Sequence, residues 1–205
     1  MLFLHLILYI WYLIEKMLEN YKIVLGSKSP RRQELLKGLD IDFGVKEIDV
    51  DENYHADLPI DKIPEYLAKQ KADAYSDFLQ NDTLLITADT IVAHKGKVYG
   101  KPKDENDAKN MLKILANSTH EVITGVCITT KERQEIFSVI TKVTFAPLTD
   151  NEIDYYVEKY KPMDKAGSYG IQEWIGYVGV EKIDGSYYNV MGLPIQKIYQ
   201  KLKFW

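Results

Sequence analysis

Cysteine is almost missing from this chain of 205 residues, which contains a single one, Cys127. One thiol cannot form an internal disulfide, and it cannot supply the several thiolates of a structural zinc site. Such usage is typical of proteins from a reducing compartment, so we expect a cytoplasmic location. It also indicates that a bound metal ion would be held by oxygen ligands.

Positive charge is in short supply, and arginine is rarer still. Lys and Arg total 26 against 30 Asp and Glu, which gives a net charge of −4. An acidic chain lacks the basic face through which proteins displace counterions from nucleic acids, so we expect no nucleic-acid partner. Only three residues are arginine, and two of them, Arg31 and Arg32, are adjacent. Because a guanidinium group holds phosphate through two parallel hydrogen bonds, this pair suggests a phosphate site.

No apolar run reaches the roughly 20 residues that a helix needs to span a bilayer. The longest, residues 2–14, is interrupted by His5 and is followed by Glu15 and Lys16. It lacks the basic start and the small-residue cleavage site of a secretory signal. We interpret residues 1–16 as an apolar extension outside the fold and residues 17–205 as a single domain. A short membrane anchor is the alternative, but we favour the extension and expect no membrane partner.

Repeats and Gly/Ser linkers are missing as well, while strand-like and helix-like patterns alternate along the chain, which predicts an α/β fold. Hydrophobic residues make up 46% of the sequence, enough for one sizeable core. Strands are predicted at residues 22–26, 43–50, 84–88, 91–94, 97–99, 120–130 and 135–147. Helices are predicted at residues 31–39, 60–79, 105–116, 149–159 and 194–203.

The segment Gly26-Ser27-Lys28-Ser29-Pro30-Arg31-Arg32 lies where the first predicted strand passes into the first helix. Ser29 is suited to cap that helix and Pro30 to begin it. The free N–H groups of a helix N-terminus attract anions, Ser27 adds a hydroxyl donor, and the two arginines can clamp a polyphosphate. The chain has no G-x-x-x-x-G-K-[ST] motif, so this is not a Walker A loop. The alternative is an ordinary capped helix with two solvated arginines.

A carboxylate, Asp89, follows the predicted strand at residues 84–88. At the carboxyl end of a buried strand, where α/β folds bind ligands, it could hold a divalent ion or accept a proton from water. The alternative is a strand-ending Asp that bonds backbone amides. An acidic run upstream is expected to form a solvated strand edge or to place one carboxylate beside Asp89 at a metal; it comprises Glu47, Asp49, Asp51 and Glu52.

A glycine-rich stretch, Ala166-Gly167-Ser168-Tyr169-Gly170-Ile171-Gln172, occurs late in the chain. Its glycines permit close approach of the backbone to a ligand, and Gln172 can read a base through a paired donor and acceptor. A simple glycine-rich turn explains the same pattern. Lys71 and Lys101 stand at suggestive places, although single lysines in a Lys-rich chain are usually on the surface.

Taken together, these segments resemble the Maf family of nucleoside triphosphate pyrophosphatases from about Lys22 to Leu202. The resemblance implies a Maf/ITPase-like α/β fold, in which a mixed sheet and two lobes surround a central nucleotide-binding cleft. It also implies hydrolysis between the α- and β-phosphates with a divalent cation, Mg²⁺ or Mn²⁺. The segments follow the family's order: Ser27-Lys28-Ser29-Pro30-Arg31-Arg32, Asp51-Glu52, Ala88-Asp89-Thr90, Gly100-Lys101-Pro102, Thr124-Gly125-Val126, residues 166–172, and Asn189-Val190-Met191-Gly192-Leu193-Pro194.

Carried over residue by residue, the resemblance makes Asp89 the catalytic proton acceptor and, with Glu52, a metal ligand. The substrate-binding positions fall on Ser27, Arg31, Arg32, Glu52, Lys71 and Lys101. Substrate choice is associated with Arg31, Thr90 and Gln172, and the A-D-T and late G-I-Q segments match the branch that prefers dTTP and UTP. The departures are the apolar extension and Lys28, where a small residue is common.

A non-catalytic nucleotide-binding regulator of cell division is the alternative function. Loss of Asp89 would have favoured it, and Asp89 is present. The resemblance leaves open the physiological substrate among canonical and modified pyrimidine nucleotides. It also leaves open the oligomeric state, with a homodimer as one candidate.

A chain that begins at Met17 is expected to remain soluble, folded and fully active. Every motif lies beyond Lys22, and the run that precedes it is too short to span a membrane. Specific activity and membrane fractionation of the two chains, measured side by side, check this. Aggregation of the shorter chain would show instead that residues 2–14 pack on the domain.

Overall fold

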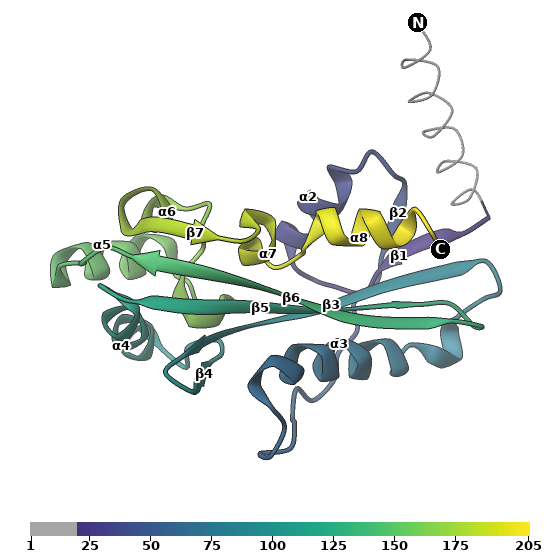
Figure 1. Ribbon diagram of the computed structural model, residues 1–205, viewed down its shortest axis with the longest axis horizontal. Coiled ribbons are helices and arrows are strands. Elements are labelled where there is room, and N and C mark those ends of the chain that lie inside the picture. Colours follow the sequence, from purple (N-terminus) through teal and green to yellow (C-terminus); the bar gives the residue numbers. More distant parts are fainter. Residues whose placement is uncertain (1–19) are drawn as a thin grey trace, which may run out of the picture.

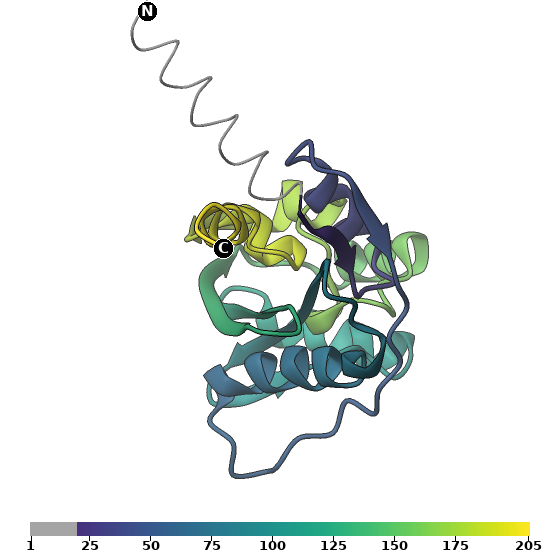
Figure 2. The same ribbon diagram turned by 90° about the vertical axis from the view of Figure 1, so that its right-hand side faces the viewer.

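The computed structural model describes residues 20–205, so the extension predicted at residues 1–16 and the domain start at Met17 lie outside the described residues. Its centre is a mixed β-sheet with helices on both faces (Figure 1, Figure 2). The predicted α/β class is therefore confirmed. Along residues 20–205, none of the helices combines the length and the apolarity needed to cross a bilayer.

Within the described residues the sheet has seven strands in the order β2-β1-β3-β5-β6-β7, with β4 paired to β3. β1 is parallel to β2 and to β3, whereas all other pairs are antiparallel. The strands are β1 (Lys22–Leu25), β2 (Phe43–Val45), β3 (Thr83–His94), β4 (Lys97–Tyr99), β5 (Thr119–Thr129), β6 (Gln134–Phe145) and β7 (Val180–Asp184).

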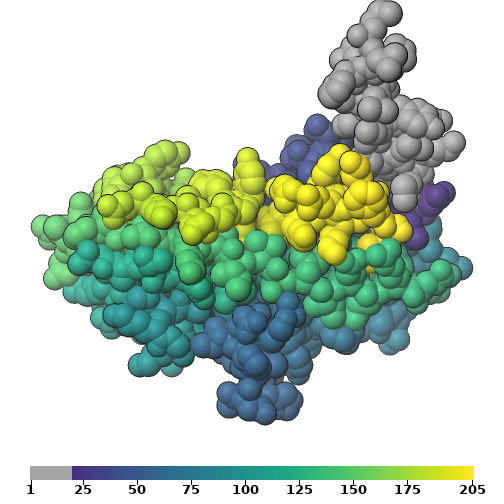
Figure 3. Space-filling model, viewed as in Figure 1, coloured from purple at the N-terminus to yellow at the C-terminus, as the bar shows by residue number. Residues whose placement is uncertain are grey.

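The longer helices divide between the two faces of this sheet (Figure 2). On one face lies α3 (Ile63–Asp73), between the short 3₁₀ turns η1 (Ile60–Lys62) and η2 (Ser76–Phe78). The other helices are α2 (Pro30–Lys37), α4 (Glu105–Leu115), α5 (Asp150–Tyr160), η3 (Ala166–Ser168), α6 (Trp174–Gly179), α7 (Tyr187–Met191) and α8 (Ile195–Leu202). On the surface seen in Figure 3, β6 lies between α8 and the segment that contains α3.

Two hydrophobic cores form the two predicted lobes. The first joins α2 and α8 to β1 and includes Leu36, whereas the second joins α4 and α5 to β5 and β6 and includes Leu112. β3 runs through both, because it contributes Ala88 to the first core and Val92 to the second. Thr90 lies between these two positions on the same face of the strand. The cleft of the protein therefore crosses the middle of β3.

The prediction that a strand ends at Asp89 is wrong, because β3 is one continuous strand of twelve residues that passes through Asp89 and Thr90. β5 pairs with it from Leu85 to Ala93 and keeps it extended. On its other edge, β1 pairs as far as Ile86 and β4 pairs only from Val92. Within residues 20–205, the part of β3 between them therefore has a strand neighbour on one side only, and this open edge exposes the site.

Other boundaries also differ from the prediction. The strand expected over residues 43–50 ends at Val45, so the acidic run does not alternate across a strand. The helix expected over residues 60–79 is α3 with a 3₁₀ turn at each end. The glycine-rich region 166–192 contains a strand, β7, and two short helices that were not predicted.

The local helix-start signals are confirmed. Ser29 caps α2 by accepting a hydrogen bond from the backbone N–H of Arg32, and Pro30 begins the helix. Thr149 and Glu152 form the predicted capping box at the start of α5. These interactions lie within one helical turn, so the sequence alone determines them.

A glycine brings α3 close to the sheet. Gly125 of β5 lies opposite Asp89, and a Cβ atom at Gly125 would stand 2.2 Å from the backbone of Pro64. Next to this contact, the hydroxyl of Thr87 donates a 2.6 Å hydrogen bond to the carbonyl of Ala68. The close approach holds α3 at the height of Asp89 on the strand.

His120 is a buried titratable group in the second core. It is 1% exposed, and its Nε2 atom lies 2.7 Å from the hydroxyl of Tyr169. Burial lowers the pKa of His120 to about 4, and the charge of His94 adds to this effect. Its ring is therefore neutral in the folded protein at neutral pH.

The stability of the protein is expected to fall as the pH drops from 6.5 towards 4. In this window the unfolded chain protonates His120 while the folded protein does not, which lowers the free energy of unfolding by about 2 kcal/mol between pH 7 and pH 5. Urea unfolding at both pH values should show a smaller loss for His120→Gln than for the unchanged protein. The exposed His55 provides the control, since His55→Gln should leave the loss unchanged. Equal losses for both variants would contradict the assignment.

Candidate active site

A cavity of about 570 Å³ opens beside the exposed edge of β3. This volume lies within the range of small-molecule sites. Every residue that the sequence nominated lines it: Ser27, Arg31, Arg32, Glu52, Lys71, Asp89, Thr90, Lys101 and Gln172. The structure thus brings together residues from β1 to α6, and their chemical roles remain predictions.

A row of alternating charges runs from the sheet to the rim of the cavity. The ammonium group of Lys71 lies 2.6 Å from Oδ1 of Asp89 and 2.8 Å from Oε1 of Glu52. The second oxygen of Glu52 lies 3.6 Å from the ammonium group of Lys101. The Lys71 and Asp89 side chains are only 10% and 12% exposed, whereas that of Lys101 is 59% exposed. Two carboxylates and two ammonium groups therefore converge from α3, β3 and two loops.

Glu52 is held in its charged form. Burial raises the pKa of its carboxyl, but the hydrogen bond and the charge of Lys71, together with Lys101, outweigh this and lower the pKa below its usual value. Glu52 is thus ionised at neutral pH, as a metal ligand or an ammonium partner must be.

The carboxylates fit a hard divalent cation only in part by themselves. Asp89 and Glu52 face one ammonium group, so their oxygens are directed at a common point between them. Over residues 20–205, no cluster of three or more His, Cys, Asp and Glu side chains has the arrangement to hold a metal. Mg²⁺ commonly binds through one or two carboxylates, with phosphate oxygens and water completing its shell. The donor set matches that arrangement.

The loop before α2 forms the anion-binding part of the cavity. Ser27 is buried, and its hydroxyl oxygen accepts a 3.2 Å hydrogen bond from the backbone N–H of Ser29. The hydroxyl proton of Ser27 is thus free to point at a ligand. Lys28 forms an ion pair with Glu47 at the surface, and this pair accounts for one member of the acidic run.

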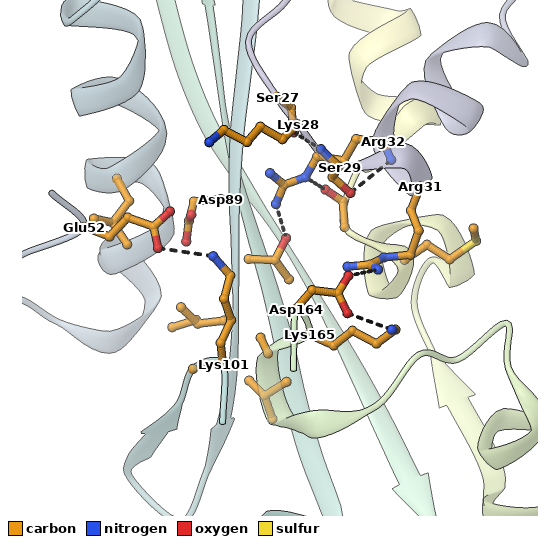
Figure 4. Close-up of a pocket in the computed structure, with 18 of the residues that line it drawn as sticks. Ser27, Lys28, Ser29, Arg31, Arg32, Glu52, Asp89, Lys101, Asp164 and Lys165 are labelled. Atoms are coloured by element: carbon orange, nitrogen blue, oxygen red, sulfur yellow. Dashed lines mark hydrogen bonds and ion pairs between the residues drawn. The ribbon is translucent and has the colours of Figure 1, made fainter. Parts of the chain in front are cut away.

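Arg32 joins α2 to the open edge of β3 (Figure 4). Its Nη1 atom donates a 2.8 Å hydrogen bond to the carbonyl of Ala88, two residues beyond the last carbonyl that β1 reaches. Its Nε and Nη2 atoms donate to the carbonyl of Gly192 at 2.7 Å and to the hydroxyl of Thr90 at 3.1 Å. Arg32 thereby commits three of its five N–H groups to acceptors of the protein itself.

Thr90 passes this contact on to the other side of the sheet. Its hydroxyl lies 2.9 Å from the hydroxyl of Thr124, which donates a 3.0 Å hydrogen bond to the carbonyl of Asn189. The fully buried Asn189 in turn donates to the carbonyl of Val122 and to the hydroxyl of Thr141. The sequence did not assign Asn189 a role. Its place in an N-V-M-G segment, with no strand or helix pattern, was the only signal.

Arg31 points in a different direction from Arg32. Its Nη1 atom lies 2.7 Å from Oδ2 of Asp164, whose other oxygen is 2.8 Å from the ammonium group of Lys165. Burial raises the pKa of Asp164, but the hydrogen bonds and charges of Lys165 and Arg31 outweigh it and lower the pKa to about 2. The sequence missed Asp164 and Lys165, although they directly precede the Ala166-Gly167 segment.

Gln172 has an amide available to a ligand. Its Oε1 atom is buried and, among the residues that the structure describes, has no hydrogen-bond partner. A buried polar atom without a partner is uncommon and disfavours the empty site. A ligand group that donates to this oxygen would remove the deficit.

The sequence profile described as "Maf-like protein" matches residues 22–205. The chain belongs to the Maf family. This membership agrees with the resemblance seen in the sequence, and it covers both lobes of the fold.

Three relatives carry the name dTTP/UTP pyrophosphatase. The Bacteroides fragilis protein is 58% identical over 91% of this chain and 97% of its own length. The Parabacteroides distasonis protein is 59% identical over 91% and 99%, and the Flavobacterium johnsoniae protein is 49% identical over 93% and 98%. Among solved structures, the Staphylococcus aureus Ham1 protein aligns over 61% of this chain and 72% of its own, with 16% identity and a TM-score of 0.46.

Arg32→Lys is expected to lower both stability and activity in this Maf protein. An ammonium group cannot reach the three acceptors of Arg32 at once, and leaving a buried carbonyl unpaired costs about 1–3 kcal/mol. Urea unfolding should show that loss, and turnover should fall more than tenfold. Arg133, which pairs with Glu135 at the surface, provides the control, since Arg133→Lys should change neither quantity. Unchanged unfolding of Arg32→Lys would mean that these hydrogen bonds do not support the fold.

Proposed function

We propose that this protein hydrolyses dTTP and UTP to the nucleoside monophosphate and pyrophosphate. The observation that carries the proposal is the meeting, in one cavity, of the charged row around Asp89 with the anion-binding start of α2. Relatives that share about half or more of the sequence over nearly the whole chain bear the corresponding name.

The reaction breaks the bond between the α-phosphorus and the oxygen that bridges it to the β-phosphorus. The oxygen of a water molecule attacks the α-phosphorus, and one proton of that water passes to Asp89. Oδ1 of Asp89 accepts from Lys71, so Oδ2 is the oxygen assigned to the incoming proton. Pyrophosphate leaves with the electrons of the broken bond.

Developing charge on the phosphates is neutralised by groups already in place. Lys101 at the rim and Lys71 behind it supply positive charge, and Ser27 with the N-terminus of α2 supplies hydrogen-bond donors. Such preorganised donors are the main source of catalysis in phosphoryl transfer. Arg32 contributes mainly by holding α2 against β3.

We assign Mg²⁺ or Mn²⁺ to the two carboxylates of Asp89 and Glu52. A divalent ion there would supply charge neutralisation and would lower the pKa of a bound water. Lys71 now lies between the two carboxylates, so it would move toward the phosphates when the ion is bound.

Selection of the base is assigned to Gln172 and Arg31. The Gln172 amide carries one donor and one acceptor, which matches the O4 and N3–H edge of thymine and uracil. Purines should be excluded mainly by size. We further propose that residues 17–205 form one domain, that the enzyme acts in the cytoplasm, and that it can form a homodimer.

Pyrophosphate release from all eight common ribo- and deoxyribonucleoside triphosphates tests the function. dTTP and UTP are expected to lead, and Asp89→Asn should reduce turnover by about 10²–10⁴ because an amide does not accept the proton. Circular dichroism should show that Asp89→Asn remains folded. ATP or GTP ranking first would place the chain outside the pyrimidine-specific branch. Nucleotide binding without hydrolysis of any of the eight would favour the non-catalytic regulator.

A further inference from the structure

An ion pair crosses the cavity from one lobe to the other. Arg31 belongs to α2, which packs in the first core, whereas Asp164 follows α5, which packs in the second. The two residues are 133 positions apart in the chain, and their side chains meet at 2.7 Å. Figure 4 shows this pair on the opposite side of Arg32 from Asp89 and Glu52.

Asp164 is fixed by groups of its own lobe. The ammonium group of Lys165, which is 8% exposed as a residue, contacts Asp164 at 2.8 Å and Oε1 of Glu173 at 3.1 Å. The other oxygen of Glu173 accepts from the hydroxyl of Tyr156, which accepts a 3.0 Å hydrogen bond from the backbone N–H of Gly170. This network ties the segment 164–173, and with it Gln172, to α5.

The position of Arg31 is therefore a matter of competition between anions. A triphosphate carries several negative charges and is a strong partner for any guanidinium within reach. Asp164 stays ionised at every physiological pH and lies on the Gln172 side of the cavity, so it draws Arg31 away from the charged row. The remaining N–H groups of Arg31 are left beside the segment that carries Gln172.

We propose that Asp164 is a positioning residue that holds Arg31 at the nucleoside end of the cavity and thereby sets the preference among bases. This inference rests on the proposed function. Without the carboxylate, Arg31 would turn to the phosphates, which all nucleotides share. The protein would then lose discrimination without losing the capacity for hydrolysis.

Asp164→Asn tests this, with Asp154→Asn as the matched control, because Asp154 forms an exposed ion pair with Lys109 on α5. For Asp164→Asn, the ratio of kcat/KM for dTTP to that for dGTP should fall about tenfold, the effect of one hydrogen bond to a charged group. The fall should reside mainly in KM for dTTP. Asp164→Glu, which keeps the charge, should restore most of the ratio, and Asp154→Asn should not change it.

A second comparison asks whether Asp164 acts through Arg31. In an Arg31→Ala background, Asp164→Asn should leave the ratio unchanged, because the group that it positions is gone. Equal losses on all eight nucleotides, or the same tenfold fall in the Arg31→Ala background, would overturn the proposal. Calorimetric affinities for dTTP and dGTP give the same ratio without turnover. A protein that binds selectively through Asp164 but hydrolyses nothing would therefore refute the proposed function and not this inference.

Discussion

The early end of β1 is the constraint from which the rest of the site follows. β1 stops at Leu25 while β3 continues, so the backbone of β3 beyond Ile86 meets no further hydrogen bond from that strand. Buried backbone groups without partners are costly, and Arg32 satisfies one of them at Ala88. To do so, α2 must begin beside the gap. The open cavity, the anion-binding helix start and the role of Arg32 therefore have one structural origin.

The charged row on the α3 face of β3 is retained for chemistry and not for stability. An apolar pair of the same shape in place of Lys71 and Asp89 would often be neutral or stabilising, because both charges lose hydration on burial. The row grades from the nearly buried Asp89 to the exposed Lys101. An incoming polyphosphate therefore meets mobile positive charge first and the fixed, dehydrated groups last, where electrostatic interactions are strongest.

The sequence predicted what local chemistry determines and missed what distant pairing determines. The caps at Ser29 and Thr149 depend on neighbours within one turn, and both were predicted correctly. The continuity of β3 through Asp89 depends on β5, more than thirty residues later, so the local polar pattern of Asp89 and Thr90 misleadingly indicated an end. β7 is exposed on most of its length and is defined by pairing with β6, so it left no hydrophobic signal. Asp164 escaped notice for the same reason, because its partner Arg31 is remote in the sequence.

The two adjacent arginines show how element assignment constrains chemistry. Consecutive residues of an α-helix point about 100° apart, so Arg31 and Arg32 cannot form one clamp once Pro30–Lys37 is a helix. The pair instead divides the cavity. Arg32 turns inward and joins the lobes through backbone carbonyls, and Arg31 reaches across to a carboxylate. Both tasks require a planar group with several fixed donors, which lysine cannot supply. A chain that otherwise relies on lysine therefore keeps arginine at the two places where the direction of the donors matters as much as the charge.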